Sequence, residues 1–235
     1  MLRFRTILVC CVTLFAGGTA ISAEDLLQST FKKMDDAATI FKGMTADVTQ
    51  VSHTAAINDD DTELGTIAIR RSKRQPMEFL IHFLKPDEKT VHFSGKEAQI
   101  YLPKSNSEQI VELGKKNNLV QQFLLIGLGG SSQDVRNGYA VRLGGEETVG
   151  GQKTVRLELA PKSPDVAKLF RLIEIWVAES GEGAGVAVQQ KLHEREGDDY
   201  ILATYSNLKL VPNLPDSAVK LNVPRDAAKS YPQVR

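Results

Sequence analysis

The chain has 235 residues, and its 29 lysines and arginines balance 29 aspartates and glutamates, so its formal net charge is zero. This balance gives no sign of the basic surface with which proteins bind nucleic acids or anionic membranes. The two cysteines, Cys10 and Cys11, both lie within residues 1–23, so the rest of the chain cannot form a disulfide framework.

Residues 1–23 combine a basic start with an apolar run from Ile7 to Phe15 and small residues up to Ala23. This pattern predicts a removed secretory signal, because the apolar run is shorter than the ~20 residues that span a bilayer. Residues 24–235 are then a single exported domain, and a chain of this length can bury one hydrophobic core.

The first predicted element after the signal is an amphipathic helix over residues 24–42. Its apolar residues recur at spacings of three and four, at Leu27, Phe31, Met34, Ala38 and Phe41. Gly43 ends the helix, and alternating apolar residues from Met44 onward predict a first strand. The acidic residues 58–63 predict a hairpin tip and not a calcium loop, because the ligand spacing and the glycine of such a loop are missing.

Short strands with intervening turn residues then predict an antiparallel meander. These strands are expected at residues 64–71, 77–84, 89–94, 97–102, 107–113, 137–143, 152–159, 172–179, 186–195 and 199–210. Two helical pieces interrupt them, at residues 117–127 and 163–170. The predicted fold class is mainly β (α+β): a sheet that curls into an incomplete barrel, with helices over its concave side. The pattern is compatible both with a filled core and with a cavity under the helices.

Catalytic motifs are missing from the sequence. His53, His82, His92 and His193 have no second ligand at zinc-like spacing, and no GxSxG elbow is present. The glycine-rich residues 127–132 follow a predicted helix and lack the lysine of a phosphate loop, so they are interpreted as the end of that helix. The sequence therefore predicts a protein that is not an enzyme and has neither cofactor nor metal.

Residues 65–88 suggest a binding site. The consecutive residues Arg70 and Arg71 end one predicted strand, so their side chains should point to opposite faces. An arginine that faces inward needs hydrogen-bond acceptors, and backbone carbonyls at a helix or loop end are suitable. The next strand carries an apolar stripe, formed by Met77, Phe79, Ile81 and Phe83. A core strand would explain such a stripe as well as a ligand site would.

Several motifs resemble a known family. In order, they are "MTADVTQ", "GTIAIRR", "MEFLIHFLKPDE", "FSGKEAQIYLP" and "LVQQFLLIG". They are similar to segments of the periplasmic outer-membrane lipoprotein carriers, the LolA-like proteins, and the match covers roughly residues 24–128. Departures occur where Ser72 replaces a proline, Ser94 an aspartate and Gln99 a tryptophan of the family pattern.

The resemblance implies a fold and a set of roles. The fold is an incomplete antiparallel barrel of about eleven strands, with a helical lid over a hydrophobic cavity. Arg71 stands at the position of the arginine that holds the lid through helix and loop carbonyls. The residues expected to line the cavity are Met77, Phe79, Ile81, Phe83, Leu119, Phe123, Ile126 and Trp176.

The resemblance also implies a function. The expected protein is a monomeric carrier in the periplasm of a Gram-negative bacterium, and its partner is an acylated lipoprotein or lipid. An inner-membrane ABC-type release complex and an outer-membrane acceptor are the further partners that it suggests. The alternative is a periplasmic sensor or interaction domain of the same fold that binds a lipidated partner.

Overall fold

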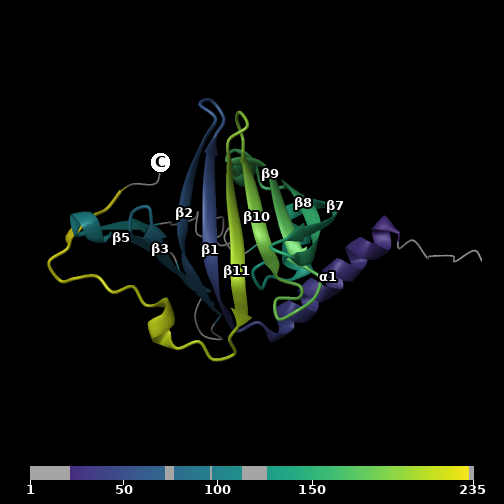
Figure 1. The fold of residues 1–235 in the computed structure, drawn as a ribbon, viewed down its shortest axis with the longest axis horizontal. Coiled ribbons are helices and arrows are strands. Elements are labelled where there is room, and N and C mark those ends of the chain that lie inside the picture. Colours follow the sequence, from purple (N-terminus) through teal and green to yellow (C-terminus); the bar gives the residue numbers. More distant parts are fainter. Residues whose placement is uncertain (1–21, 72–76, 96, 113–125, 233–235) are drawn as a thin grey trace, which may run out of the picture.

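The computed structural model describes residues 22–71, 77–95, 97–112 and 126–232, and Figure 1 shows their arrangement. The predicted signal therefore lies almost wholly outside the described residues, as do residues 117–125 of the predicted lid helix. Within the described ranges, no helix has the length and apolarity needed to cross a membrane.

The first element is helix α1 (Ala23–Ile40), close to the predicted range. The side chain of Ser22 caps it by accepting a hydrogen bond from the backbone N–H of Asp25, at 3.0 Å. Glu24 and Asp25 in the first turn stabilise the helix, because their negative charges lie near the partial positive charge of its N-terminus. The buried face consists of Thr30, Phe31, Met34 and Ala37.

Six strands follow as a first antiparallel meander: β1 (Gly43–Thr54), β2 (Asp59–Arg70), β3 (Glu78–Lys85), β4 (Lys89–Ser94), β5 (Glu97–Leu102) and β6 (Ser107–Glu112). Five more form a second: β7 (Tyr139–Val149), β8 (Gln152–Pro161), β9 (Phe170–Ala178), β10 (Ala187–Glu194) and β11 (Tyr200–Leu210). The short elements are α3 (Ser132–Gly138), α4 (Pro164–Ala167), and the 3-10 turns η1 (Pro103–Ser105) and η3 (Asp216–Val219).

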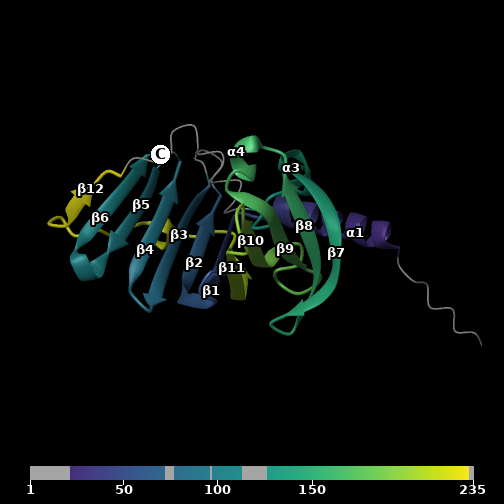
Figure 2. The same ribbon diagram turned by 90° about the horizontal axis from the view of Figure 1, so that it is seen from above.

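Pairing of β1 with β11 joins the two meanders into one twelve-stranded sheet, in the order β12-β6-β5-β4-β3-β2-β1-β11-β10-β9-β8-β7. Its curvature is visible from above in Figure 2. The sheet stays open, with β12 and β7 at its two edges. The predicted mainly β, incomplete barrel is thereby confirmed. The strand beyond the eleven expected is β12 (Ala228–Ser230), which pairs in parallel with β6.

The core lies on the concave side of this sheet. Alternate residues of the second meander pack there against the buried face of α1, as in the cluster of Met34, Leu157 and Ile175. The first meander adds Ile69 and Phe79 to the same cluster. One continuous core thus supports both halves of the sheet.

The C-terminal segment runs over the opposite face. In Figure 1 it is the yellow segment that leads from the foot of β11 to the far edge of the first meander. Its turn η3 lies beside β2 and β3, where Asp216 pairs with Arg70 and Val219 is buried. The segment then ends in β12, which covers the edge of β6.

Three local features differ from the predictions. The hairpin tip lies at residues 55–58, because Asn58 takes a left-handed conformation (φ 49°), and the acidic residues extend β2. Strand β7 continues through a bulge at Gly145 (φ 110°) to Val149, beyond residue 143, where the predicted strand ends. Helix α3 was not predicted, although Ser131 and Asp134 form a capping box at its start.

Candidate ligand-binding cavity

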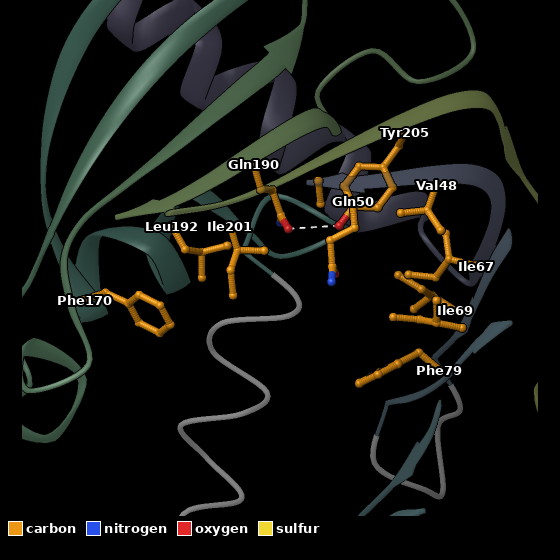
Figure 3. Close-up of a pocket in the computed structure, with 12 residues that line it drawn as sticks. Val48, Gln50, Ile67, Ile69, Phe79, Phe170, Gln190, Leu192, Ile201 and Tyr205 are labelled. Carbon is orange, nitrogen blue, oxygen red and sulfur yellow. Dashed lines mark hydrogen bonds between the residues drawn. The ribbon is translucent and has the colours of Figure 1, made fainter. Parts of the chain in front are cut away.

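The concave side contains a cavity of about 260 Å³. It lies where the two meanders meet, with β1, β2 and β3 on one side and β9, β10 and β11 on the other (Figure 3). The lining residues are Val48, Gln50, Ile67, Ile69, Phe79, Ile81, Phe170, Gln190, Leu192, Ile201, Ala203 and Tyr205. The wall is almost entirely apolar, so the cavity suits hydrocarbon and not a charged ligand.

Strand alternation explains which residues face the cavity. Side chains two positions apart on a strand point to the same face, and the wall takes such pairs from β1, β2, β3 and β10. The register sets Ile67 opposite both Ala46 and Ile81, so that neighbouring strands present apolar side chains at the same level. The same alternation sends the polar neighbours Thr66 and His82 to the opposite face.

The predicted lining residues fall into different places. Phe79 and Ile81 lie in the cavity wall. Phe83 is buried in the core beside the wall, and Met77 packs against that core while partly exposed. Ile126 is buried and contributes its backbone carbonyl, which is described below. Leu119 and Phe123 lie outside the described residues.

Trp176 lies on the opposite face of β9, away from this cavity. Its neighbours Ile175 and Val177 point into the main core, so alternation turns the indole outward. There it packs in a small cluster with Ala178 and Val188, and its Nε1 donates a 2.7 Å hydrogen bond to Glu147.

A second polar network lies on this same outer face. Glu174 accepts hydrogen bonds from Arg156 and from His193, the latter at 2.7 Å. Burial alone would raise the pKa of Glu174, but the hydrogen bonds from His193 and Arg156 outweigh it and lower that pKa below its ordinary value of 4.5. The network is a structural support of the second meander. Among the described residues, no group of three or more His, Cys, Asp or Glu side chains could hold a metal ion.

The cavity wall contains one buried polar pair that sequence reasoning missed. The hydroxyl of Tyr205 donates to Oε1 of Gln190 at 3.0 Å, and Nε2 of Gln190 donates to the backbone carbonyl of Ile126. Burial raises the pKa of Tyr205 well above its ordinary value, so its hydroxyl stays protonated and can act as the donor. A glutamine and a tyrosine on separate strands form no motif, so the sequence carried no signal for this pair.

Arg71 lies beyond the end of β2 and points toward helix α1. Its guanidinium donates to the carbonyl of Ala38 at 3.2 Å and to that of Gly129 at 2.6 Å. It also lies 5.4 Å from the centre of the Phe41 ring, within the range of a cation–π contact. Burial lowers the pKa of Arg71, while Asp134 opposes the shift.

Arg70 points the opposite way, as strand alternation predicts. It forms an ion pair with Glu78 and another with Asp216 of the C-terminal segment. The two consecutive arginines thus serve different faces of the sheet. Of the two, Arg71 is the one that connects β2 with the helix and with the segment that follows residue 125.

Two glycines allow that segment to approach so closely. Gly127 and Gly129 have left-handed conformations, with φ of 76° and 85°. A Cβ on Gly129 would lie 2.5 Å from the Phe41 ring, and one on Gly127 would lie 2.7 Å from the Cβ of Ala187. Because both positions lack a side chain, the Gly129 carbonyl can reach Arg71.

Solved structures with a similar fold include an uncharacterised conserved protein from Thermus thermophilus and MucB. The Thermus protein is 15% identical, with 88% of this chain and 99% of that chain covered and a TM-score of 0.54. MucB is 13% identical, with 87% of this chain and 64% of that chain covered and a TM-score of 0.51. The LolA superfamily protein NE2245 from Nitrosomonas europaea is 14% identical, with 86% and 99% covered and a TM-score of 0.44.

No protein-family model and no curated protein matches the sequence. The Thermus protein and MucB are thus solved structures whose fold resembles that of this chain. At such low identity the likeness shows the fold and not the function. The fold that the chain shares with these two proteins is an open curled sheet with helices on its concave side.

Proposed function

We propose that this protein is a non-enzymatic carrier that shields the acyl chains of lipoproteins, or of related lipids, between the inner and outer membranes. The observation that carries the proposal is the apolar cavity of about 260 Å³ at the junction of the two meanders. An unfilled apolar cavity costs stability, because the surrounding side chains lose contacts. A hydrocarbon ligand would restore those contacts.

The energetics fit a carrier. Exposure of a sixteen-carbon acyl chain to water costs on the order of 12 kcal/mol, at about 0.8 kcal/mol per methylene. The cavity, at about 260 Å³, is slightly smaller than the ~300–1,000 Å³ of pockets for drug-sized ligands. In this conformation the volume of the cavity can hold part of one acyl chain, and a larger ligand requires the cavity to widen.

Arg71 is the proposed latch. Its hydrogen bonds to Ala38 and Gly129 tie helix α1 and the glycine-rich segment to the end of β2. If ligand entry parts these elements, the latch opposes binding and favours release. A carrier needs this balance, because it has to hand its cargo on.

The remaining assignments follow from this role. Residues 1–23 would be removed on export, and residues 24–235 would act as one periplasmic domain. The cargo would come from an inner-membrane ABC-type release complex and pass to an outer-membrane acceptor. The cavity requires no second copy of the chain, so a monomer is expected.

A second candidate function keeps the same ligand. MucB shares the fold and has been crystallised in complex with MucA. By analogy, this protein could bind a membrane signalling partner and respond to a lipidated ligand instead of transporting it. A carrier should pass its ligand to acceptor membranes, whereas a sensor should retain the ligand and bind a protein partner.

Native mass spectrometry of residues 24–235, purified from the periplasm without detergent, tests the proposal. We expect an additional mass that corresponds to a lipid or an acylated peptide. An Ile81→Asn variant, which places an amide in the cavity wall, should lose that mass, and Leu80→Asn on the opposite face of β3 should keep it. A ligand-free mass that persists when a triacylated lipoprotein is offered would overturn the proposal.

A further inference from the structure

The side-chain amide of Gln190 is a costly group to place in an apolar cavity wall. Gln190 is only 4% exposed and its partner Tyr205 is 8% exposed, yet both line the cavity. Burial of an amide is unfavourable unless its polar atoms are hydrogen-bonded. The amide therefore needs hydrogen-bond partners within the wall.

The neighbours of Gln190 fix the orientation of its amide. The carbonyl of Ile126 can only accept a hydrogen bond, so the NH₂ group of Gln190 must face it. The Tyr205 hydroxyl then donates to Oε1 at 3.0 Å. An amide NH₂ group has two N–H donors, and the bond to Ile126 uses one of them.

The carbonyl that Gln190 holds belongs to a segment with three such attachments. Beside the bond at Ile126, the backbone N–H of Ala187 donates to Gly127 at 2.8 Å, and Arg71 donates to Gly129 at 2.6 Å. Of the three donors, only Gln190 also lines the cavity. Gln190 is therefore the point at which the content of the cavity can act directly on residues 126–129.

We propose that Gln190, oriented by Tyr205, recognises the acyl carbonyl of the ligand, which makes the ligand an acyl ester or amide and not a plain hydrocarbon. The ligand carbonyl accepts a hydrogen bond from the second N–H of the Gln190 amide, while the Ile126 carbonyl keeps the first. This inference rests on the proposed acyl-chain carrier function. It adds to that function a specificity-determining residue that connects the ligand with residues 126–129.

Two matched ligands and one matched variant test the inference. The ligands are methyl hexadecanoate, which has an ester carbonyl, and hexadecyl methyl ether, which has the same chain without it. Competition against a fluorescent fatty acid measures the affinity of the mature protein for each. The variants are Gln190→Leu, Tyr205→Phe and, as the control, Gln189→Leu. Gln189 is the neighbouring glutamine on β10, but it does not line the cavity and its side chain accepts a hydrogen bond from Thr204.

We expect the wild-type protein to prefer the ester by about five-fold to ten-fold, the discrimination that one hydrogen bond provides. Gln190→Leu should abolish this preference, Tyr205→Phe should reduce it, and Gln189→Leu should leave it unchanged. Equal binding of ester and ether by the wild type, or an unchanged preference in Gln190→Leu, would overturn the inference while leaving the carrier function intact. Failure of both ligands to bind would overturn the carrier function itself.

Hydrogen exchange of the ligand-free protein gives a readout that does not depend on a ligand. The Ala187 amide donates to Gly127, so its exchange rate reports whether residues 126–129 are docked. Gln190→Leu should speed this exchange several-fold, whereas Gln189→Leu should not. Equal exchange in the two variants would show that Gln190 does not hold the segment.

Discussion

Filling the cavity from within distinguishes an open site from a packed core. Ala203 on β11 lines the cavity and is 7% exposed. Replacement by leucine adds three carbons, which contribute about 2 kcal/mol if they enter empty apolar space. In a packed core the same change costs about 1–3 kcal/mol through strain. The two interpretations therefore predict opposite signs for the change in unfolding free energy.

We expect Ala203→Leu to raise the unfolding free energy of the ligand-free protein by about 1–2 kcal/mol and to weaken acyl-ligand binding at least ~10-fold. Urea denaturation and titration with a fluorescent fatty acid measure the two effects. Ala178→Leu is the control, because Ala178 is fully buried in the Trp176 cluster and does not line the cavity. That variant should be destabilised without a change in affinity. Destabilisation of Ala203→Leu with unchanged binding would refute a functional cavity.

The other predictions concern the latch and the outer network. In the proposed latch, the hydrogen bonds of Arg71 favour the closed, ligand-free form, so Arg71→Leu should slow ligand dissociation roughly ten-fold for each ~1.4 kcal/mol lost. Stopped-flow release measures this, Arg70→Leu is the control, and equal rates in the two variants would contradict the latch. Because the pKa of Glu174 lies below its ordinary value of 4.5, its stabilising contribution is present above pH 4.5 and is lost as the pH falls through the lowered value. The stability difference between wild type and Glu174→Gln should therefore narrow on acidification. Asp36→Asn is the control, because Asp36 forms an exposed ion pair, and its unfolding free energy should stay close to that of the wild type at every pH. A stability difference between wild type and Glu174→Gln that does not change with pH would contradict the lowered pKa of Glu174.

Strand alternation and turn residues were sufficient to predict most of the sheet. They failed where one residue changed the local conformation: Gly145 introduces a bulge that lets β7 continue, and Asn58 closes the hairpin ahead of the acidic run. Strand β12 could not be predicted from Ala228–Ser230, because its pairing with β6 depends on the path of the C-terminal segment over the opposite face.

The candidate site was predictable only in part. Alternation placed Phe79 and Ile81 on one face and separated Arg70 from Arg71, because these are properties of a single strand. The pairing of Gln190 with Tyr205 depends on the register of two strands and on a carbonyl far away in sequence, which no local pattern encodes. The position of Trp176 could have been predicted from alternation along β9, because Ile173 and Ile175 point into the core and the residue between Ile175 and Val177 must point to the other face.

The junction of β1 with β11 also determines at which stage of folding the cavity forms. Met44 pairs with Leu210 and His53 with Tyr200, so the joint unites residues from near the two ends of the described chain. Each meander can form from local contacts, whereas this joint must wait for distant segments to meet, which is the slow step in sheets of high contact order. Until β11 has been synthesised, β1 has an unpaired edge and the cavity has one wall. The cavity at the junction of the two meanders is therefore completed last in folding, and only a molecule whose sheet is complete has both of its walls.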